Sequence, residues 1–109
     1  MSLTISERTA ALSILNQFKG NLETMATILE DIKQLPIEEA EWEKAGKTET
    51  TVGTNIHWNW SDELGGEKEI ELQKTTLDYI KAAIKEKDEK KELTLKSEDR
   101  ALVSLNNKL

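Results

Sequence analysis

The sequence predicts an α+β fold in a single domain: an amino-terminal helical part, a small three-stranded antiparallel sheet, and two carboxyl-terminal helices packed on that sheet. Residues 1–46 and 73–109 repeat their apolar positions at the helical spacing of three or four. Residues 47–72 instead contain two runs in which apolar and polar residues alternate, which is the period of a half-buried strand. A chain of 109 residues has the size of one domain, so we expect the three parts to share one core.

The first helix is predicted over residues 5–18. Thr4 and Glu7 have the spacing of a capping box, in which each side chain satisfies a backbone amide at the start of the helix. Gly20 is expected to end this helix in the left-handed conformation, and Asn21 to cap a second helix. Because the link is short, the two helices should form an antiparallel hairpin. The apolar stripe of the second helix consists of Leu22, Met25, Ile28, Leu29 and Ile32.

A short acidic helix is predicted over residues 37–45, because Pro36 suits a first turn and Gly46 a helix end. Its carboxylates lie mostly near its positive amino end. Trp42 is out of strict register with the packing residues of this helix, so we expect it to be partly exposed. The acidic surface of the helix consists of Glu38, Glu39, Glu41 and Glu43.

Three strands are predicted over Thr48–Val52, Ile56–Trp60 and Lys68–Leu72, where β-branched and aromatic residues gather. Residues 53–55 have the composition of a three-residue hairpin loop, and residues 61–66 of a longer, mobile connection. One face of the sheet should pack on the helices. That face carries Ile56, Trp58, Trp60, Ile70 and Leu72.

Two helices are predicted after the sheet. The first begins at Thr75 or Thr76, and its later part, residues 85–92, is a solvated run of alternating charges. The second begins near Ser97. The core faces of these helices consist of Leu77, Ile80, Ala83 and Ile84 in the first, and Leu102, Leu105 and Leu109 in the second.

Composition and charge exclude several kinds of protein. The chain has no cysteine, which excludes disulfides, thiolate metal sites and cysteine nucleophiles. It has no apolar run near the roughly 20 residues of a membrane span and no secretory signal, so we expect a soluble, cytoplasmic protein. The net charge of −6 divides into −4 for residues 1–46, −4 for residues 47–72 and +2 for residues 73–109. This acidic balance argues against direct nucleic-acid binding, and the basic last part favours contact with an acidic neighbouring copy.

The sequence offers little evidence for catalysis or cofactor binding. His57 is the only histidine and the obvious acid–base candidate, but the alternation places it on the solvated side of the sheet, opposite to the side that carries Trp58. An enzyme that uses His57 stays an alternative. The sequence has no calcium loop and no zinc-binding helix motif, and Gly65-Gly66 lacks the lysine of a nucleotide loop. We expect no catalytic residue, no metal and no cofactor.

The tryptophans allow two interpretations. Trp58 and Trp60 either pack as core or make an exposed patch that anchors a partner, since tryptophan is enriched in binding hot spots. A chain with five aromatic residues needs them inside, which favours the core. If the patch is exposed, the candidate interface residues are Trp58, Trp60 and Trp42.

The pattern of apolar and acidic positions resembles a group of small uncharacterised proteins encoded by tailed bacteriophages and prophages. The resemblance spans most of the chain and implies a phage context inside a bacterial host cell, with no catalytic motif. The segments that carry it are Glu7-Arg8, Leu12 to Leu15, Gly20-Asn21, Met25 to Leu29, Glu38-Glu39, Trp58-Asn59-Trp60 and Glu67 to Leu72.

These observations favour a non-enzymatic binding or assembly protein that acts through protein–protein contacts, either with another protein or as a homo-oligomer. The main alternative is an acidic mimic of nucleic acid that inhibits a host DNA-binding enzyme. The mimic requires a continuous stripe of carboxylates on one surface. The candidates for that stripe are Glu38, Glu39, Glu41, Glu43, Glu69 and Glu71.

Overall fold

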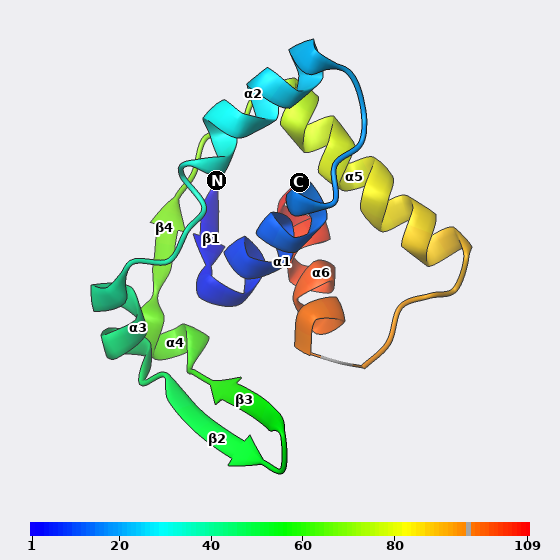
Figure 1. Cartoon of the computed structure of the whole chain (residues 1–109). Helices are drawn as coiled ribbons and strands as arrows, with labels where there is room; N and C mark the ends of the chain where they lie inside the picture. The colour runs from blue at the N-terminus through cyan, green and yellow to red at the C-terminus, as the bar shows by residue number, and fades with distance from the viewer. Residues whose placement is uncertain (96) are drawn as a thin grey trace.

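The computed structural model describes residues 1–95 and 97–109, apart from the side chains of Val52, His57, Ser97 and Glu98. The fold is α+β, as predicted. Its helices are α1 (Ile5–Asn16), α2 (Leu22–Ile32), α3 (Glu39–Ala45), α4 (Asp62–Gly65), α5 (Lys74–Glu89) and α6 (Ser97–Lys108). Its strands are β1 (Ser2–Thr4), β2 (Thr48–Val52), β3 (Asn55–Asn59) and β4 (Glu67–Glu69). Figure 1 shows α1 at the centre, between the β1–β4 pair and helices α5 and α6.

The start of α1 confirms the predicted capping box. The Glu7 amide donates to Thr4 Oγ1 at 3.2 Å, and the Thr4 amide donates to Glu7 Oε1 at 2.9 Å. The end of α1 differs from the prediction, because the helix stops at Asn16 and Gly20 does not adopt a positive φ. Gly20 instead leaves room for the ring of Phe18, which would have to shift for any Cβ at this position, since that Cβ would lie 2.5 Å from Cζ of Phe18.

Helix α2 begins at the predicted cap, where Asn21 Oδ1 accepts from the Thr24 amide at 2.8 Å. Its predicted apolar stripe faces the core only in part: Ile28 is buried and Ile32 packs against the core, whereas Leu22 is 78% exposed and Leu29 is 52% exposed. The buried side carries Ile28 and the carboxylate of Asp31. This carboxylate binds the first turn of α5, against which α2 lies (Figure 1). The contact with α5 therefore turns part of the predicted stripe outward.

The strands form two antiparallel pairs, so the predicted three-stranded sheet is wrong. Strands β2 and β3 pair from Thr48↔Asn59 to Val52↔Asn55. Gly53, with a φ of +64°, begins the turn between them, which is one residue shorter than predicted. The predicted third strand shrinks to β4, which pairs with β1 at the amino terminus instead.

Residues 61–66 contain the short helix α4 and contact α1 and α3, where the sequence predicted only a long connection. Ser61 caps the short helix α4, and its own amide donates to the Ala45 carbonyl at 2.8 Å. Gly65 lies against α1, because a Cβ added there would be 2.6 Å from Cδ1 of Ile5 and 3.1 Å from Cβ of Ala45. This contact joins α1, α3 and α4 at the base of the β2–β3 hairpin.

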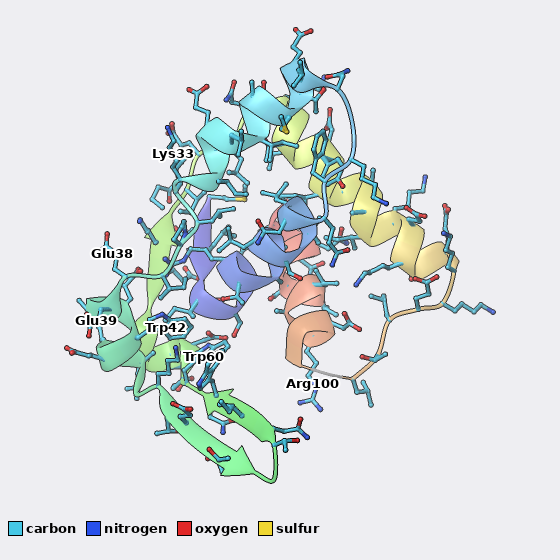
Figure 2. The ribbon with its side chains drawn as sticks, in the orientation of Figure 1. Lys33, Glu38, Glu39, Trp42, Trp60 and Arg100 are labelled. Carbon is cyan, nitrogen blue, oxygen red and sulfur yellow. The ribbon has the colours of Figure 1, made fainter. Side chains whose placement is uncertain are left out.

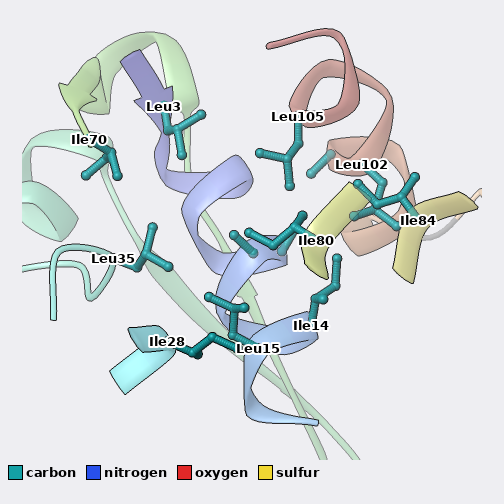
Figure 3. Close-up of a cluster of buried hydrophobic side chains, with 13 residues drawn as sticks. Leu3, Ile14, Leu15, Ile28, Leu35, Ile70, Ile80, Ile84, Leu102 and Leu105 are labelled. Atoms are coloured by element: carbon teal, nitrogen blue, oxygen red, sulfur yellow. The ribbon is translucent and has the colours of Figure 1, made fainter. Parts of the chain in front are cut away.

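One apolar core lies around α1, with contributions from both ends of the chain (Figure 3). Helix α5 begins at Lys74, slightly before the predicted start, and buries Ile80 and Ile84 as predicted. Its charged end stays exposed. The core consists of Leu3, Ala10, Ala11, Ile14, Leu15, Ile28, Leu35, Ile70, Ile80, Ile84, Ala101, Leu102 and Leu105.

Candidate protein-binding surface

The β2–β3 hairpin carries the aromatic run from the middle of the sequence. Its register pairs Glu49 with Trp58 and Thr51 with Ile56, and residues directly opposite one another share a face of a sheet. These four side chains make up what we call the outer face of the hairpin. Ile56 and Trp58 are each 55% exposed there. The prediction that both residues belong to the core is therefore wrong.

The prediction failed because the hairpin lies away from the apolar core. Figure 1 shows it at the lower end of the molecule, beyond α3 and α4. Of the predicted apolar row, Ile70 is fully buried and Leu72 packs partly buried against the core. These two residues follow β4, which pairs with β1 and not with β3. The alternation showed which side chains share a face, but it did not show what covers that face.

Trp60, just after β3, is half-buried and fixed by hydrogen bonds. Its Nε1 donates to Asp62 Oδ1 at 3.0 Å and to Ser6 Oγ at 3.2 Å. The same Asp62 oxygen accepts from the amide of Ser6 at 3.1 Å and from its hydroxyl at 2.9 Å. A buried indole needs such a partner for its N–H. Trp60 thereby ties the end of the hairpin to the first turn of α1.

Trp42 comes from α3 and packs on Trp60 edge to face. The ring centroids lie 5.0 Å apart and the ring planes make an angle of 70°, within the range that favours aromatic pairs. Figure 2 shows both rings where α3 meets the base of the hairpin. Trp42 is partly exposed, as predicted. We call Trp42, Trp58 and Trp60 the tryptophan cluster.

Lys47 contacts both Trp42 and Trp58 of this cluster, and sequence reasoning missed it. Its Nζ lies 4.3 Å from the ring centroid of Trp42 and 4.7 Å from that of Trp58. A cation within about 6 Å of an indole face is attracted by the quadrupole of the ring, whose face has a negative electrostatic potential. The sequence alone did not reveal this contact, because it depends on the register of the hairpin: the observed pairing Thr48↔Asn59 continues to place Lys47 opposite Trp60 and diagonal to Trp58, whereas the predicted three-residue loop would shift it by one residue.

A buried ion pair positions α3, and with it Trp42. Arg8 of α1 is 0% exposed, and its Nη1 donates to Glu41 Oε2 at 3.1 Å. The second guanidinium nitrogen, Nη2, lies 3.0 Å from Glu41 Oε1. This guanidinium is the main reason that the pKa of Glu41 lies below its ordinary value. The carboxylate also accepts from the Glu38 amide at the start of α3.

The acidic candidates do not act as one free stripe. Glu38, Glu39 and Glu43 are exposed, and Figure 2 shows the first two on the outside of α3. Glu41 is bound to Arg8, as described above. Glu69 accepts from the amino-terminal ammonium at 2.7 Å, which lowers the pKa of this carboxyl group. Two of the six carboxylates are thus already paired with cations of the chain, and the mimic gains no support.

Other kinds of site gain no support in the described part of the chain. No group of three or more metal-binding side chains gathers among the described residues. No helix found there is long and apolar enough to cross a membrane. The backbone of His57 pairs with Thr50 in the hairpin, but its side chain lies outside the described residues, so the alternative of an enzyme that uses His57 stays a prediction.

Comparison with known proteins identifies no relative of this chain. The chain matches no protein-family model, no curated protein and no solved structure.

Proposed function

We propose that the chain is a non-enzymatic protein-binding module whose contact surface is the outer face of the β2–β3 hairpin. The partner is a protein with a complementary apolar patch, and a second copy of the chain is one such partner. From the phage resemblance the proposal also takes its setting, the cytoplasm of a bacterial host cell.

The exposure of Trp58 carries this proposal. An aromatic side chain can bury about 150–250 Å², yet more than half of Trp58 faces solvent in a chain with only three tryptophans. Ile56 extends the apolar surface beside it, and the charged side chains of Glu49 and Lys47 lie at its margin. An apolar centre with a charged rim is the usual composition of a protein interface, and tryptophan is enriched among the residues that dominate binding energy.

The test uses wild-type chain and the Trp58→Ser variant as tagged baits in a bacterial lysate, with light scattering of each purified chain. We expect the wild type either to retain a defined protein or to form a defined oligomer. Trp58→Ser should weaken that association at least about tenfold, since truncating a hot-spot residue costs roughly 2 kcal/mol or more.

Leu22→Ser provides the matched control, because Leu22 is even more exposed but lies on α2. This variant should keep the association of the wild type. A wild type that is a strict monomer without a retained protein would defeat the proposal, and so would an association that Trp58→Ser and Leu22→Ser weaken equally.

A further inference from the structure

We propose that Trp42 and Trp58 form a receptor for an alkylammonium group, namely the lysine or methylated lysine side chain of a partner protein, and that Lys47 fills this receptor when no partner is bound. The inference rests on the proposed function, because it names the chemical group that a partner presents to the hairpin. The inference also states that the Lys47 side chain of the same molecule blocks this binding site.

The geometry around the Lys47 ammonium is that of a cation between two aromatic faces. Nζ lies 4.3 Å from one ring centroid and 4.7 Å from the other, so both indoles contact the same charge. Proteins that bind quaternary ammonium or methylated lysine do so with such aromatic groups. The space that Lys47 occupies is therefore complementary to an alkylammonium ion from any source.

The two rings are held by separate elements, which preorganises the receptor. Trp42 stands on α3 and packs against Trp60, whose N–H is bound to Asp62 and Ser6. Trp58 stands on β3 within the paired hairpin. The Trp42 ring is therefore held without Lys47, and the Trp58 ring is carried by a strand whose pairing does not involve the Lys47 side chain, so both indoles should stay near this position when that side chain leaves.

The charge around the receptor also favours a cation. Glu49 lies directly opposite Trp58 in the hairpin register and belongs to the outer face. Glu67 and Glu69, which belong to the same acidic stretch of sequence, lie on β4 and are paired with Lys108 and the amino terminus, so Glu49 is the carboxylate that the hairpin register brings to this face. A negative potential of this kind raises the local concentration of cations and repels anions.

Lys47 can leave without a change in the backbone. Its main-chain amide is bound to the Trp42 carbonyl at 3.1 Å, which fixes the start of the hairpin, whereas its side chain is an exposed, flexible stem. A partner's lysine then replaces one cation–π contact by an equivalent one. Lys47 thus acts as an internal competitor at high effective concentration.

The test titrates tetramethylammonium chloride into the full chain at constant ionic strength and follows the indole N–H signals by NMR. Lys47→Met keeps an apolar stem but removes the charge, and Lys47→Gln is a second variant that opens the receptor. We expect both variants to give saturable shifts of the Trp42 and Trp58 signals, with tighter binding than in the wild type. Adding Trp58→Leu to Lys47→Met should weaken binding about two- to fivefold, because one of two cation–π contacts is lost.

Two controls separate a cation receptor from a general effect. Lys44→Met removes the same charge from α3, away from the contacts that Lys47 makes, and should bind like the wild type. tert-Butyl alcohol has a similar shape but no charge and should give no saturable shift. The inference is overturned if the alcohol binds as well as the cation, if the variants with an open receptor bind no better than the wild type, or if neither variant saturates.

Failure here is distinguishable from failure of the proposed function. The titration needs no partner protein, so a negative result removes the alkylammonium receptor and leaves the bait experiment to decide on protein binding. Suppose instead that the titration is positive but Trp58→Ser does not weaken the protein association of the bait experiment. This result would establish the receptor and rule out the hairpin as the protein contact.

Discussion

Two adjacent charged residues of α1 hold opposite parts of the molecule. Arg8 binds Glu41 of α3, and Glu7 accepts from Lys108 of α6 at 2.7 Å. Both α1 side chains are buried. The sequence predicted Glu7 as a capping residue, but nothing in it marked Arg8, because a charged residue on an amphipathic helix is usually solvated. An ion pair between segments distant in sequence leaves no local pattern.

Replacing Glu41 by Gln tests the contribution of the Arg8 pair. The substitution keeps the shape of the side chain but leaves the buried guanidinium without its counter-ion. Within the described part of the chain, Nε of Arg8 already lacks a hydrogen-bonding partner. The guanidinium therefore has little to compensate the loss of the Glu41 carboxylate. We expect the free energy of unfolding to fall by about 3 kcal/mol, measured by urea denaturation at pH 7.

The matched control is Glu39→Gln, which alters an exposed carboxylate of the same helix and should leave stability unchanged. The double variant with Arg8→Met and Glu41→Leu removes both charges and should recover most of the loss, because no buried charge remains. Equal effects of Glu41→Gln and Glu39→Gln would show that the pair contributes nothing specific.

At the scale of elements, most predictions that rest on residues inside or beside the element succeeded, and the left-handed end at Gly20 is an exception. The Thr4 capping box, the Asn21 cap and the helix end at Gly46, where φ is +69°, are all confirmed. The bounds of β2, Thr48–Val52, match the prediction. Each of these features depends on one to five neighbouring residues, so the sequence alone can reveal it.

Predictions failed where the partner of an element had to be known. β1 has only three residues, which is too short for an alternation to show, and it takes the place beside β4 that the prediction gave to β3. Likewise, the tryptophan cluster joins α3, the hairpin and Lys47, and only Trp42, Trp58 and Trp60 could be named as candidates beforehand. Periodicity assigns side chains to a face, while tertiary contacts decide what covers it.

The close contact at Gly65 gives a test at this scale. A methyl group there would collide with Ile5 at the start of α1, a side chain that is fully buried. We expect Gly65→Ala to lower the free energy of unfolding by about 1–3 kcal/mol, as overpacking does, measured by urea denaturation.

Ile5→Val is the partner variant, because it removes the Cδ1 atom that the new methyl group would meet. Alone it should cost about 0.5–1.5 kcal/mol. Combined with Gly65→Ala it should cost less than the two changes added together. Strict additivity would contradict the inferred collision.

At the scale of the whole molecule, the two ends of the chain meet at the β1–β4 pair. The amino-terminal ammonium donates to Glu69 and to the Ile70 carbonyl. Lys108, the last residue of α6, donates to the Ser2 carbonyl at 2.9 Å and to Glu67 at 2.8 Å, besides Glu7. The terminal segments therefore close the fold around α1.

This closure shifts the pKa values of the groups involved. Burial by itself would raise the pKa of Glu7, but hydrogen bonds from Lys108 and from the Thr4 amide outweigh it and hold the pKa below its ordinary value of 4.5. Burial would lower the pKa of Lys108, yet its bonds to Glu67 and Glu7 raise it above its ordinary 10.5. Both shifts favour the charged forms in the folded chain.

The pH dependence of stability follows from these directions. The carboxylate of Glu7 stabilises the fold above the unfolded pKa, and this contribution is lost as the pH falls through the lower folded pKa. The contribution of Lys108 is lost as the pH rises through its raised folded pKa. We expect a nearly constant free energy of unfolding between about pH 6 and pH 9 and a decline on both sides, measured by urea denaturation across the range.

Glu7→Gln isolates the acid side of this profile. The variant should be less stable at pH 7 and should lose less stability between about pH 5 and pH 3 than the wild type does. An acid decline as steep as that of the wild type would show that other carboxylates, such as Glu41, account for all of it.

Because the hairpin lies outside the core, the residues that we propose for recognition are different from those that stabilise the fold. The buried side chains that hold the fold together come from the helices and from the segments around β1 and β4. The described side chains of β2 and β3 are exposed and lie outside that cluster. Substitutions on this arm can therefore change what the molecule meets while the body keeps its stability. Such an arrangement lets a lineage exchange one partner for another without first acquiring a more stable core.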